Sequence, residues 1–291
     1  MIVNGQTIKS LNTGFSAVFS KSFGDVVSQM SKIATVVPST TKVNEYAWLG
    51  SFPQVREWVG DKVIKELSAH SYTIKNKKWE NTIGVDKDDI EDDAIGIYTP
   101  MVQELGMSAA SHPDELVFKA LEDGNGQKCY DGQYFFDTDH QVAGSSVSNI
   151  TTGSAPKWVL LDTSRALKPI IFQERKKATF KKLSEDSEHA FKTGRELMGS
   201  EARYNVGYGF WQQAHLSMQA LTEDNFNNVR KAMRVQKGDN GQPLRVKPTT
   251  IVIHPDLEAT AEKLFALKTL SQGGDNPLYQ KVEIIVADIW S

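Results

Sequence analysis

Four side chains that can bind a metal ion or transfer a proton lie near the middle of the sequence: His112, Asp137, Asp139 and His140. Three of them fall within four consecutive residues, and in a strand Asp137 and Asp139 would point to the same face. Such groups could serve a metal-dependent hydrolase, in which the ion activates a water molecule. A zinc site needs three or four convergent ligands, however, and no His-x-x-x-His pair is present to anchor them. The spacing favours a turn in which the aspartates accept hydrogen bonds from backbone amides and His140 packs beside them.

The sequence contains no other motif that is typical of an enzyme. The segment Gly124-Asn125-Gly126-Gln127-Lys128 lacks the spacing and the Lys-Ser/Thr pair of a phosphate-binding loop, and no Gly-x-Ser-x-Gly elbow is present. The single cysteine, Cys129, excludes an internal disulfide and is expected to behave as a small buried apolar side chain. We therefore predict no catalytic residue, no metal ligand and no cofactor.

The charge balance argues against a protein whose main task is to grip nucleic acid. The chain has 33 Lys and Arg against 36 Asp and Glu, a net charge of −3, whereas such proteins carry a strong basic excess. Its basic cluster at 175–182 is followed by acidic residues at 185–188, which indicates a solvated mixed-charge face. We find no apolar run of about 18 residues and no signal-peptide pattern, so we expect no membrane span and no secretion.

Residues 1–55 are predicted to form an N-terminal arm. Phe15, Phe19 and Phe23 recur at intervals of four within an apolar stripe that continues to Ala34, as on one face of an amphipathic helix. Two interpretations remain open, because composition cannot separate them. The helix packs on its own domain, or it reaches a neighbouring subunit. A second helical pattern follows at 56–70.

The stretch at 71–92 is predicted to be an extended loop. From Tyr72 to Val85 neither alternate face is consistently apolar, which is untypical of a strand in a core sheet and fits a projecting hairpin or long loop. The lysines at 75, 77 and 78 would protect its edge from stray strand pairing.

A long helical stripe covers 93–123 and a mixed region of strands and helices follows. Pro113 interrupts the stripe, so we expect either one kinked helix or two helices in line. Beyond it, apolar patterns predict strands at 158–161, 170–172, 202–210, 249–253 and 282–287, and a helix at 224–234. The fold class is therefore expected to be α+β.

Several segments, taken in order, resemble the major head subunit of Mu-like tailed bacteriophages and prophages. In the first part of the chain they are Arg56-Glu57-Trp58-Val59-Gly60-Asp61, Asp88-Asp89-Ile90-Glu91-Asp92-Asp93, Gly96, Tyr98-Thr99-Pro100, Tyr130-Asp131-Gly132-Gln133 and Phe136-Asp137-Thr138-Asp139-His140. In the second part they are Leu167-Lys168-Pro169-Ile170-Ile171-Phe172-Gln173, Arg175-Lys176-Lys177, Gly199, Ala202-Arg203-Tyr204-Asn205, Gly207-Tyr208-Gly209, Trp211-Gln212 and Asn276-Pro277-Leu278-Tyr279. The resemblance covers most of the chain from about residue 56 onward.

The resemblance implies an α+β fold of the Hong Kong 97 type, with an N-terminal arm, an extended two-stranded loop, a peripheral domain with a long spine helix, and an axial domain. In that scheme 1–55 is the arm, 56–70 and 93–123 are helices of the peripheral domain including the spine helix, and 71–92 is the extended loop. Residues 124–291 then form the rest of the peripheral domain and the axial α/β domain.

The same resemblance implies a major capsid protein that self-assembles, as pentamers and hexamers, into the icosahedral shell enclosing phage DNA. Its expected partners are itself, a scaffold or maturation protease and a portal protein, with the DNA enclosed without sequence-specific binding and no membrane involved. It would be part of the virion and be assembled in the bacterial host cytoplasm. The residues expected to contribute to self-assembly are Phe15, Phe19, Phe23, Tyr72, Lys75, Lys77, Lys78 and Trp79. The alternatives are the hydrolase described above and the shell of a cargo-enclosing nanocompartment.

Overall fold

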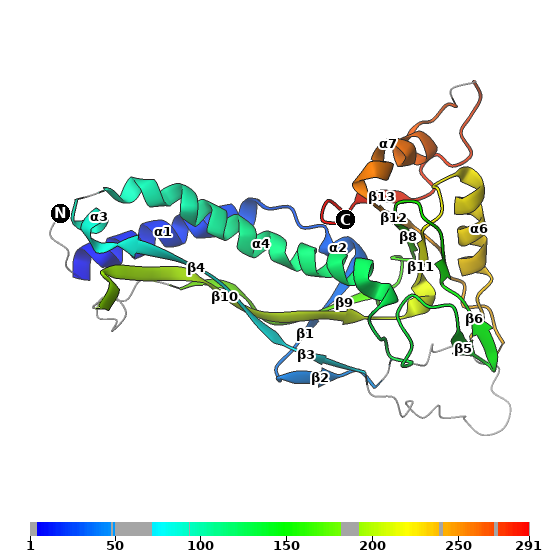
Figure 1. Cartoon of the computed structure of the whole chain (residues 1–291), viewed down its shortest axis with the longest axis horizontal. Coiled ribbons are helices and arrows are strands. Elements are labelled where there is room, and N and C mark those ends of the chain that lie inside the picture. The colour runs from blue at the N-terminus through cyan, green and yellow to red at the C-terminus, as the bar shows by residue number, and fades with distance from the viewer. Residues whose placement is uncertain are drawn as a thin grey trace.

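The computed structural model describes residues 5–47, 49, 72–92, 94–181, 192–238, 241–270 and 273–290. The predicted helix at 56–70 and the end of the predicted arm lie outside these ranges. Figure 1 shows an elongated limb, in which two long helices run along a sheet, joined at one end to a compact domain. Among the described residues, no helix is long and apolar enough to span a membrane.

The two helices of the limb, α1 (Gly5–Asp25) and α4 (Thr99–Glu122), lie side by side. Phe15 and Phe19 of α1 are buried in a cluster with apolar side chains of α4, so the predicted arm packs on its own chain. Gly106 permits this close approach, since a Cβ atom there would lie 2.7 Å from the carbonyl oxygen of Phe19. A short helix, α2 (Met30–Ile33), follows α1.

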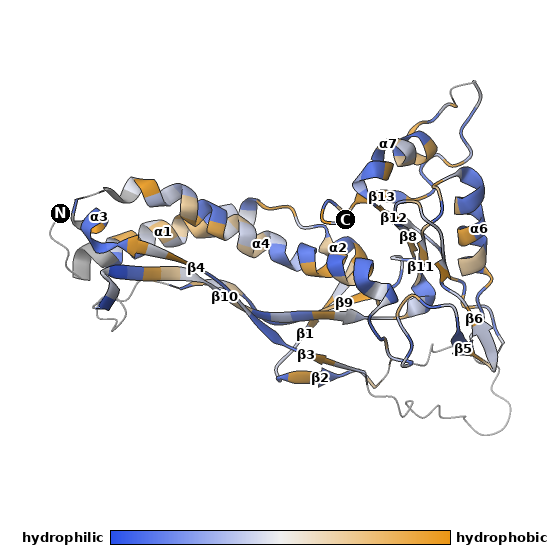
Figure 2. Ribbon diagram, in the orientation of Figure 1, coloured by the Kyte–Doolittle hydropathy of each residue, from blue (hydrophilic) through white to orange (hydrophobic). Residues whose placement is uncertain are grey.

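Helix α4 is one continuous helix that contains Pro113, which resolves the two alternatives for this stretch. A 3-10 turn, η1 (Ala94–Tyr98), precedes α4, and another, η2 (Asp123–Asn125), follows it. Hydrophilic and hydrophobic segments alternate along α4 in Figure 2, as expected for a helix with one buried face.

The sheet of the limb has the strand order β1-β9-β10-β4. Its strands are β1 (Ala34–Pro38), β9 (Ile170–Lys181), β10 (Arg195–Tyr208) and β4 (Lys77–Asp86). Strand β10 is antiparallel to both β9 and β4, whereas β1 is parallel to β9. One face of the sheet packs against α4 and α1, and Val85 and Met198 enter the same buried cluster as Phe19.

The prediction that 71–92 forms a projecting hairpin is wrong. Strand β4 pairs along its whole length with β10, from Lys77 opposite Tyr204 to Asp86 opposite Arg195. Strand β3 (Thr73–Lys75) pairs instead with β2 (Val43–Glu45), and α3 (Lys87–Glu91) follows β4. As an edge strand that is covered on one face only, β4 lacks the apolar alternation of a core strand, and its pattern therefore resembled that of a loop.

The compact domain is built on a five-stranded sheet of order β13-β12-β8-β11-β7. The strands are β7 (Ile150–Thr151), β8 (Trp158–Leu161), β11 (Ala214–Ser217), β12 (Thr250–Ile253) and β13 (Glu283–Val286). Trp158 and Leu160 face a cluster that includes Phe226 and Phe265, while Val159 and Leu161 face the core shared with the limb. Burial on both faces explains the uninterrupted apolar run of β8.

Helices and short turns complete the compact domain. Helix α6 (Glu223–Arg234) and the succession η4 (Pro255–Leu257), α7 (Glu258–Ala261) and η5 (Glu262–Ala266, a π-helix) supply Phe226 and Phe265 to its core. A small hairpin of β5 (His140–Val142) and β6 (Ser145–Val147) lies nearby, and η3 (Trp211–Gln213) precedes β11. The strands predicted at 158–161, 249–253 and 282–287 and the helix at 224–234 are thus confirmed within one residue at each end.

Candidate functional site

The four residues of the predicted hydrolase site form no common site. His112 lies on α4, where its Nδ1 is 2.8 Å from the hydroxyl of Tyr204 and its ring meets that of Trp79 edge-on at 4.5 Å. These three side chains line a cavity of about 80 Å³ between α4 and the sheet. Desolvation by burial lowers the pKa of His112, with a smaller opposing contribution from Glu115. His112 is thus a packing residue of the limb.

Asp137 and Asp139 act within a local turn, as the sequence favoured. The Asp137 carboxylate accepts hydrogen bonds from the backbone amides of Tyr134 at 3.2 Å and Thr138 at 2.7 Å. The Asp139 carboxylate accepts one from the side-chain amide of Gln133 at 3.2 Å. Among the described residues the possible ligands that come together are Cys129, Asp131 and His140, so the set of His112, Asp137, Asp139 and His140 does not form.

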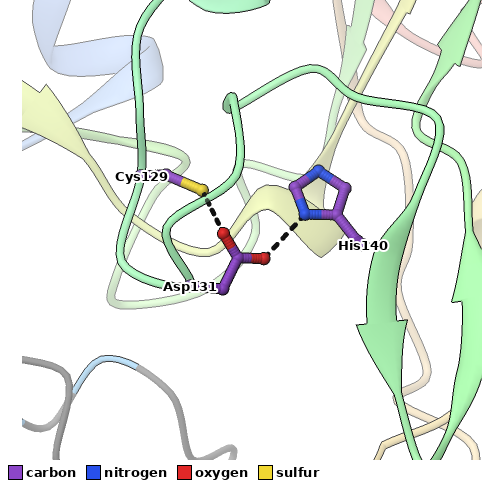
Figure 3. A group of neighbouring side chains, drawn as sticks. All are labelled: Cys129, Asp131 and His140. Carbon is purple, nitrogen blue, oxygen red and sulfur yellow. Dashed lines mark hydrogen bonds and ion pairs between the residues drawn. The ribbon is translucent and has the colours of Figure 1, made fainter.

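His140 belongs to a different group, with two residues that the sequence search did not combine with it. Its Nδ1 donates to Oδ2 of Asp131 at 2.7 Å, while the Cys129 thiol donates to Oδ1 of the same carboxylate at 3.1 Å (Figure 3). The imidazole is fully buried and stacks on Trp211 with ring centres 3.9 Å apart and planes 8° apart. The only hint in the sequence was Asp131-Gly132, a turn signal, and Gly132 adopts the left-handed φ of 84° that such a turn requires.

The hydrogen bonds of this group hold its three side chains in place and leave the thiol unreactive. Burial, followed by the charge of Asp131, raises the pKa of the Cys129 thiol well above its usual value, so the sulfur stays protonated and is a poor nucleophile. Burial alone would also raise the pKa of Asp131, but the hydrogen bonds from His140 and Cys129 hold it below its usual value. The ligand atoms lie within 4.8 Å of one another, yet both donors are already committed to the Asp131 carboxylate.

The aromatic residues predicted to take part in self-assembly mostly make contacts within their own chain. Phe15 and Phe19 are buried, and Phe23 is half-buried and stacks on Phe19. The half-buried Tyr72 accepts a hydrogen bond from the Tyr208 amide, and burial raises the pKa of its hydroxyl to about 12. The indole of Trp79 donates to the carbonyl of Tyr204 at 3.0 Å.

The predicted lysines, by contrast, are exposed. Lys75, Lys77 and Lys78 all face solvent, and the Lys77 ammonium lies 5.9 Å from the centre of the Trp79 ring. Lys78 lies directly opposite Arg203 on β10, and Arg203 is paired with Lys176 on β9 at an irregularity of the register, so three cations form a row across the sheet in which Lys176 is also paired with Glu201 at 3.8 Å. We call the part of the sheet turned away from α4 the exposed sheet face; it is defined by Lys78, Arg195, Glu201 and Arg203.

Similarity to known proteins extends over almost the whole chain. Residues 8–290 match the family described as Mu-like prophage major head subunit gpT. The chain is 44% identical over 303 residues to the major capsid protein of Escherichia phage Mu, with 99% of both proteins covered. It is 43% identical to the Mu-like prophage FluMu major head subunit of Haemophilus influenzae, with 98% of both covered.

Solved structures agree with this relationship. The subunit in the procapsid of bacteriophage JBD30 superimposes with a TM-score of 0.84 at 42% identity, covering 98% of this chain and 99% of that one. The subunit in the JBD30 capsid decorated with minor capsid protein trimers gives a TM-score of 0.76 at 33% identity, covering 99% of each chain. The protein therefore belongs to the Mu-like major head subunit family: it is a major capsid protein of a phage head, with the Hong Kong 97-type fold, and its relatives are structural proteins rather than enzymes.

Proposed function

We propose that this chain assembles with itself into pentamers and hexamers, and that these build the icosahedral shell around the phage DNA. The observation that carries the proposal is the exposed sheet face, since a long sheet covered by helices on one side only leaves a polar surface for neighbours. An elongated subunit also gains contact area without needing a larger core. Many weak contacts of this kind add up in a closed symmetric shell.

The residues expected to contribute to self-assembly divide into two groups under this proposal. Lys75, Lys77 and Lys78 are exposed and would contact a neighbouring subunit directly. The aromatic residues, Phe15, Phe19, Phe23, Tyr72 and Trp79, would act indirectly, because they fix the arm and the strands of the limb in place.

We further propose the partners that a shell of this kind requires. These are a scaffold or maturation protease and a portal protein, with assembly in the cytoplasm of the bacterial host. The JBD30 relative is described in a capsid decorated with minor capsid protein trimers, and this shell would accept a comparable partner. The enclosed DNA would be held without sequence-specific contacts, which a net charge of −3 supports because it offers little counterion release.

Electron microscopy of the purified full chain, combined with its mass by light scattering, tests the proposal. We expect capsomer rings, tubes or shells, and unchanged assembly in the presence of a chelator. A chain that stays monomeric at high concentration, even with the scaffold of its own phage, would contradict self-assembly.

A further inference from the structure

The second half of α6 and the segment that follows it carry a run of basic residues. From residue 225 to residue 247 the sequence has six basic residues against one acidic residue, Asp239, which lies outside the described residues. The basic residues are Arg230, Lys231, Arg234, Lys237, Arg245 and Lys247. The net charge of −3 is an average over the whole chain, and a local excess of this kind still creates a positive potential at its own surface.

Backbone pairing brings the two halves of this run together. The Leu244 amide donates to the carbonyl of Gln236 at 2.9 Å, and Lys237 forms an antiparallel bridge with Pro243. The returning segment therefore lies against the residues that directly follow α6, and the basic residues after position 244 come close to those that precede position 238.

Core packing turns the charged side chains outward. Leu244 and Val246 are buried in the same cluster as Met233 of α6, whereas Arg245 and Lys247, which alternate with them, are exposed. On α6 itself, the residues three apart on the exposed side are neighbours. We call the five exposed basic residues the α6 basic patch: Lys231, Arg234, Lys237, Arg245 and Lys247. Figure 1 shows α6 on the side of the compact domain that is remote from the limb.

Within the described part of the chain, the α6 basic patch forms no ion pair with a carboxylate. Asp162 accepts a hydrogen bond from the Lys247 backbone amide at 2.8 Å, but its carboxylate is fully buried and paired with Arg165 at 3.4 Å. On the limb, by contrast, Lys176 and Lys181 share the carboxylate of Glu201. The patch therefore keeps positive charge that is available to a partner.

The dipole of α6 accounts for only part of this charge. Cations in the last turn of a helix offset the partial negative charge of its C-terminus, and Lys231 and Arg234 occupy that turn. The effect falls off within the last turn. Lys237, Arg245 and Lys247 lie beyond the end of the helix, so its dipole gives no reason for them.

We propose that the α6 basic patch binds the phosphate backbone of the enclosed DNA without reading its sequence. This inference deepens the proposed function and rests on it, because a shell around DNA holds a dense polyanion against its subunits. The composition favours DNA over a protein partner: protein interfaces are depleted of lysine and enriched in aromatic residues, whereas the one large exposed apolar neighbour of the patch is Val235. Contacts to phosphate carry no sequence information.

Salt-dependent binding of a short labelled duplex of mixed sequence to the full chain tests the patch. Fluorescence anisotropy should show that binding weakens as salt rises, because each phosphate contact releases counterions. We expect Lys237→Gln, Arg245→Gln and Lys247→Gln together to lower the affinity at low salt at least tenfold. The slope of log affinity against log salt should become less steep by about three, roughly one for each cation removed.

The matched control removes three exposed lysines elsewhere in the compact domain: Lys263→Gln, Lys268→Gln and Lys281→Gln. This control makes the same change in net charge and should bind the duplex as the unchanged chain does. Unaltered binding by the patch variant, or an equal loss in the control, would overturn the proposal. Lys237→Gln with Lys247→Gln covers the case in which the triple variant fails to fold, because it keeps Arg245, whose φ of 55° is left-handed. Its slope should change by about two.

Two further measurements separate the possible failures. Polyglutamate of the same total charge as the duplex is the second probe, and tighter binding of polyglutamate than of the duplex would assign the patch to an acidic protein segment instead of DNA. Electron microscopy in the absence of DNA should show the same particles for the patch variants and the unchanged chain. Particles without patch-dependent DNA binding contradict this inference alone, whereas an unchanged chain that forms no particles contradicts the proposed self-assembly.

Discussion

The limb and the compact domain bury their sheets in different ways. In the compact domain, alternate residues of β8 enter two separate cores, so the sheet is covered on both faces. In the limb, β4 and β10 are covered by α1 and α4 on one face, and the other face remains exposed. A region with fewer buried contacts opens at a lower cost in free energy. We infer that the compact domain supplies stability within the single chain, whereas the limb leaves part of its surface for neighbouring subunits.

Matched tryptophan substitutions test this difference most strongly. Trp158 on β8 is fully buried and its indole donates to the carbonyl of Gln219 at 2.8 Å. We expect Trp158→Ala to lower the free energy of unfolding by about 4 kcal/mol, through lost burial and a cavity. Trp79 on β4 is only half-buried, and Trp79→Ala should cost about 1–2 kcal/mol, which includes one hydrogen bond.

Denaturant unfolding followed by circular dichroism measures both values. The two variants exchange the same residue types, so their difference reports the environment rather than the chemistry of the side chain. Equal losses of stability, or a larger loss for Trp79→Ala, would contradict the view that the compact domain is the more tightly packed part.

Lowering the pH from 6.5 to 4 should reduce the stability of the fold mainly through a histidine of the compact domain. His215 on β11 is buried, with Nε2 2.7 Å from the Thr151 hydroxyl, and burial lowers its pKa to about 4. In the unfolded chain the imidazole titrates near 6.5, so between pH 6.5 and 4 the unfolded state binds more protons. The stability contributed by neutral His215 is therefore complete above pH 6.5 and is lost on going down to pH 4, by about 3 kcal/mol.

His215→Gln provides the control for this pH effect. The free energy of unfolding of the variant should depend less on pH between 4 and 6.5 than that of the unchanged chain. His112, the half-buried histidine of the limb, should contribute less, so His112→Gln should leave the slope almost unaltered. Equal slopes for the unchanged chain and His215→Gln would contradict the assignment.

The same contrast explains how much of the fold the sequence could predict. The compact domain was predictable, because strands buried on both faces, such as Trp158–Leu161, read as short uninterrupted apolar runs. The long helix of the limb was also predictable, since Val102, Leu105 and Ala109 mark its buried face. The pairing of β4 with β10 was not, because the two strands are more than a hundred residues apart and the edge strand has polar residues on its exposed face.

The candidate site shows the same limit at the level of side chains. The turn at Asp137 was predictable because an aspartate bonds to amides close to it in sequence. The group of Cys129, Asp131 and His140 depends on how the chain brings His140 against Trp211, which follows Cys129 by 82 residues and His140 by 71. Local spacing carries no information on that contact.

A smaller effect is expected at the joint between the arm and α4. The Asp114 carboxylate accepts three hydrogen bonds from the start of α2, from the Ser28 hydroxyl at 2.5 Å and the amides of Gln29 at 2.8 Å and Met30 at 3.0 Å. Asp114→Ala should lower the free energy of opening α1 from α4 by about 2 kcal/mol, because hydrogen bonds to a charged acceptor and a helix-capping contact are lost.

Hydrogen exchange of the α1 amides measures this opening. Exchange should become roughly thirtyfold faster in α1, as 1.4 kcal/mol corresponds to a factor of ten, and stay unchanged in β8 and β12. Glu104→Ala removes an exposed carboxylate from the same helix and serves as the control. If both variants exchange at the rate of the unchanged chain, Asp114 does not hold the arm.

The smallest effect on stability is expected for a charge reversal at Lys78, on the exposed sheet face of the limb. Lys78, Arg203 and Lys176 lie opposite one another on adjacent strands, and like charges in such positions destabilise a sheet. Lys78→Glu should therefore stabilise the isolated subunit by about 0.5 kcal/mol, because it places a carboxylate beside Arg203. If the row of cations contacts a neighbouring subunit, the same substitution should reduce assembly. Lys237→Glu, an equal charge change at an exposed position of the compact domain, should alter neither quantity. Opposite signs for stability and assembly at position 78 would mean that the charge row is retained for contacts between subunits, and parallel signs would mean that it is not.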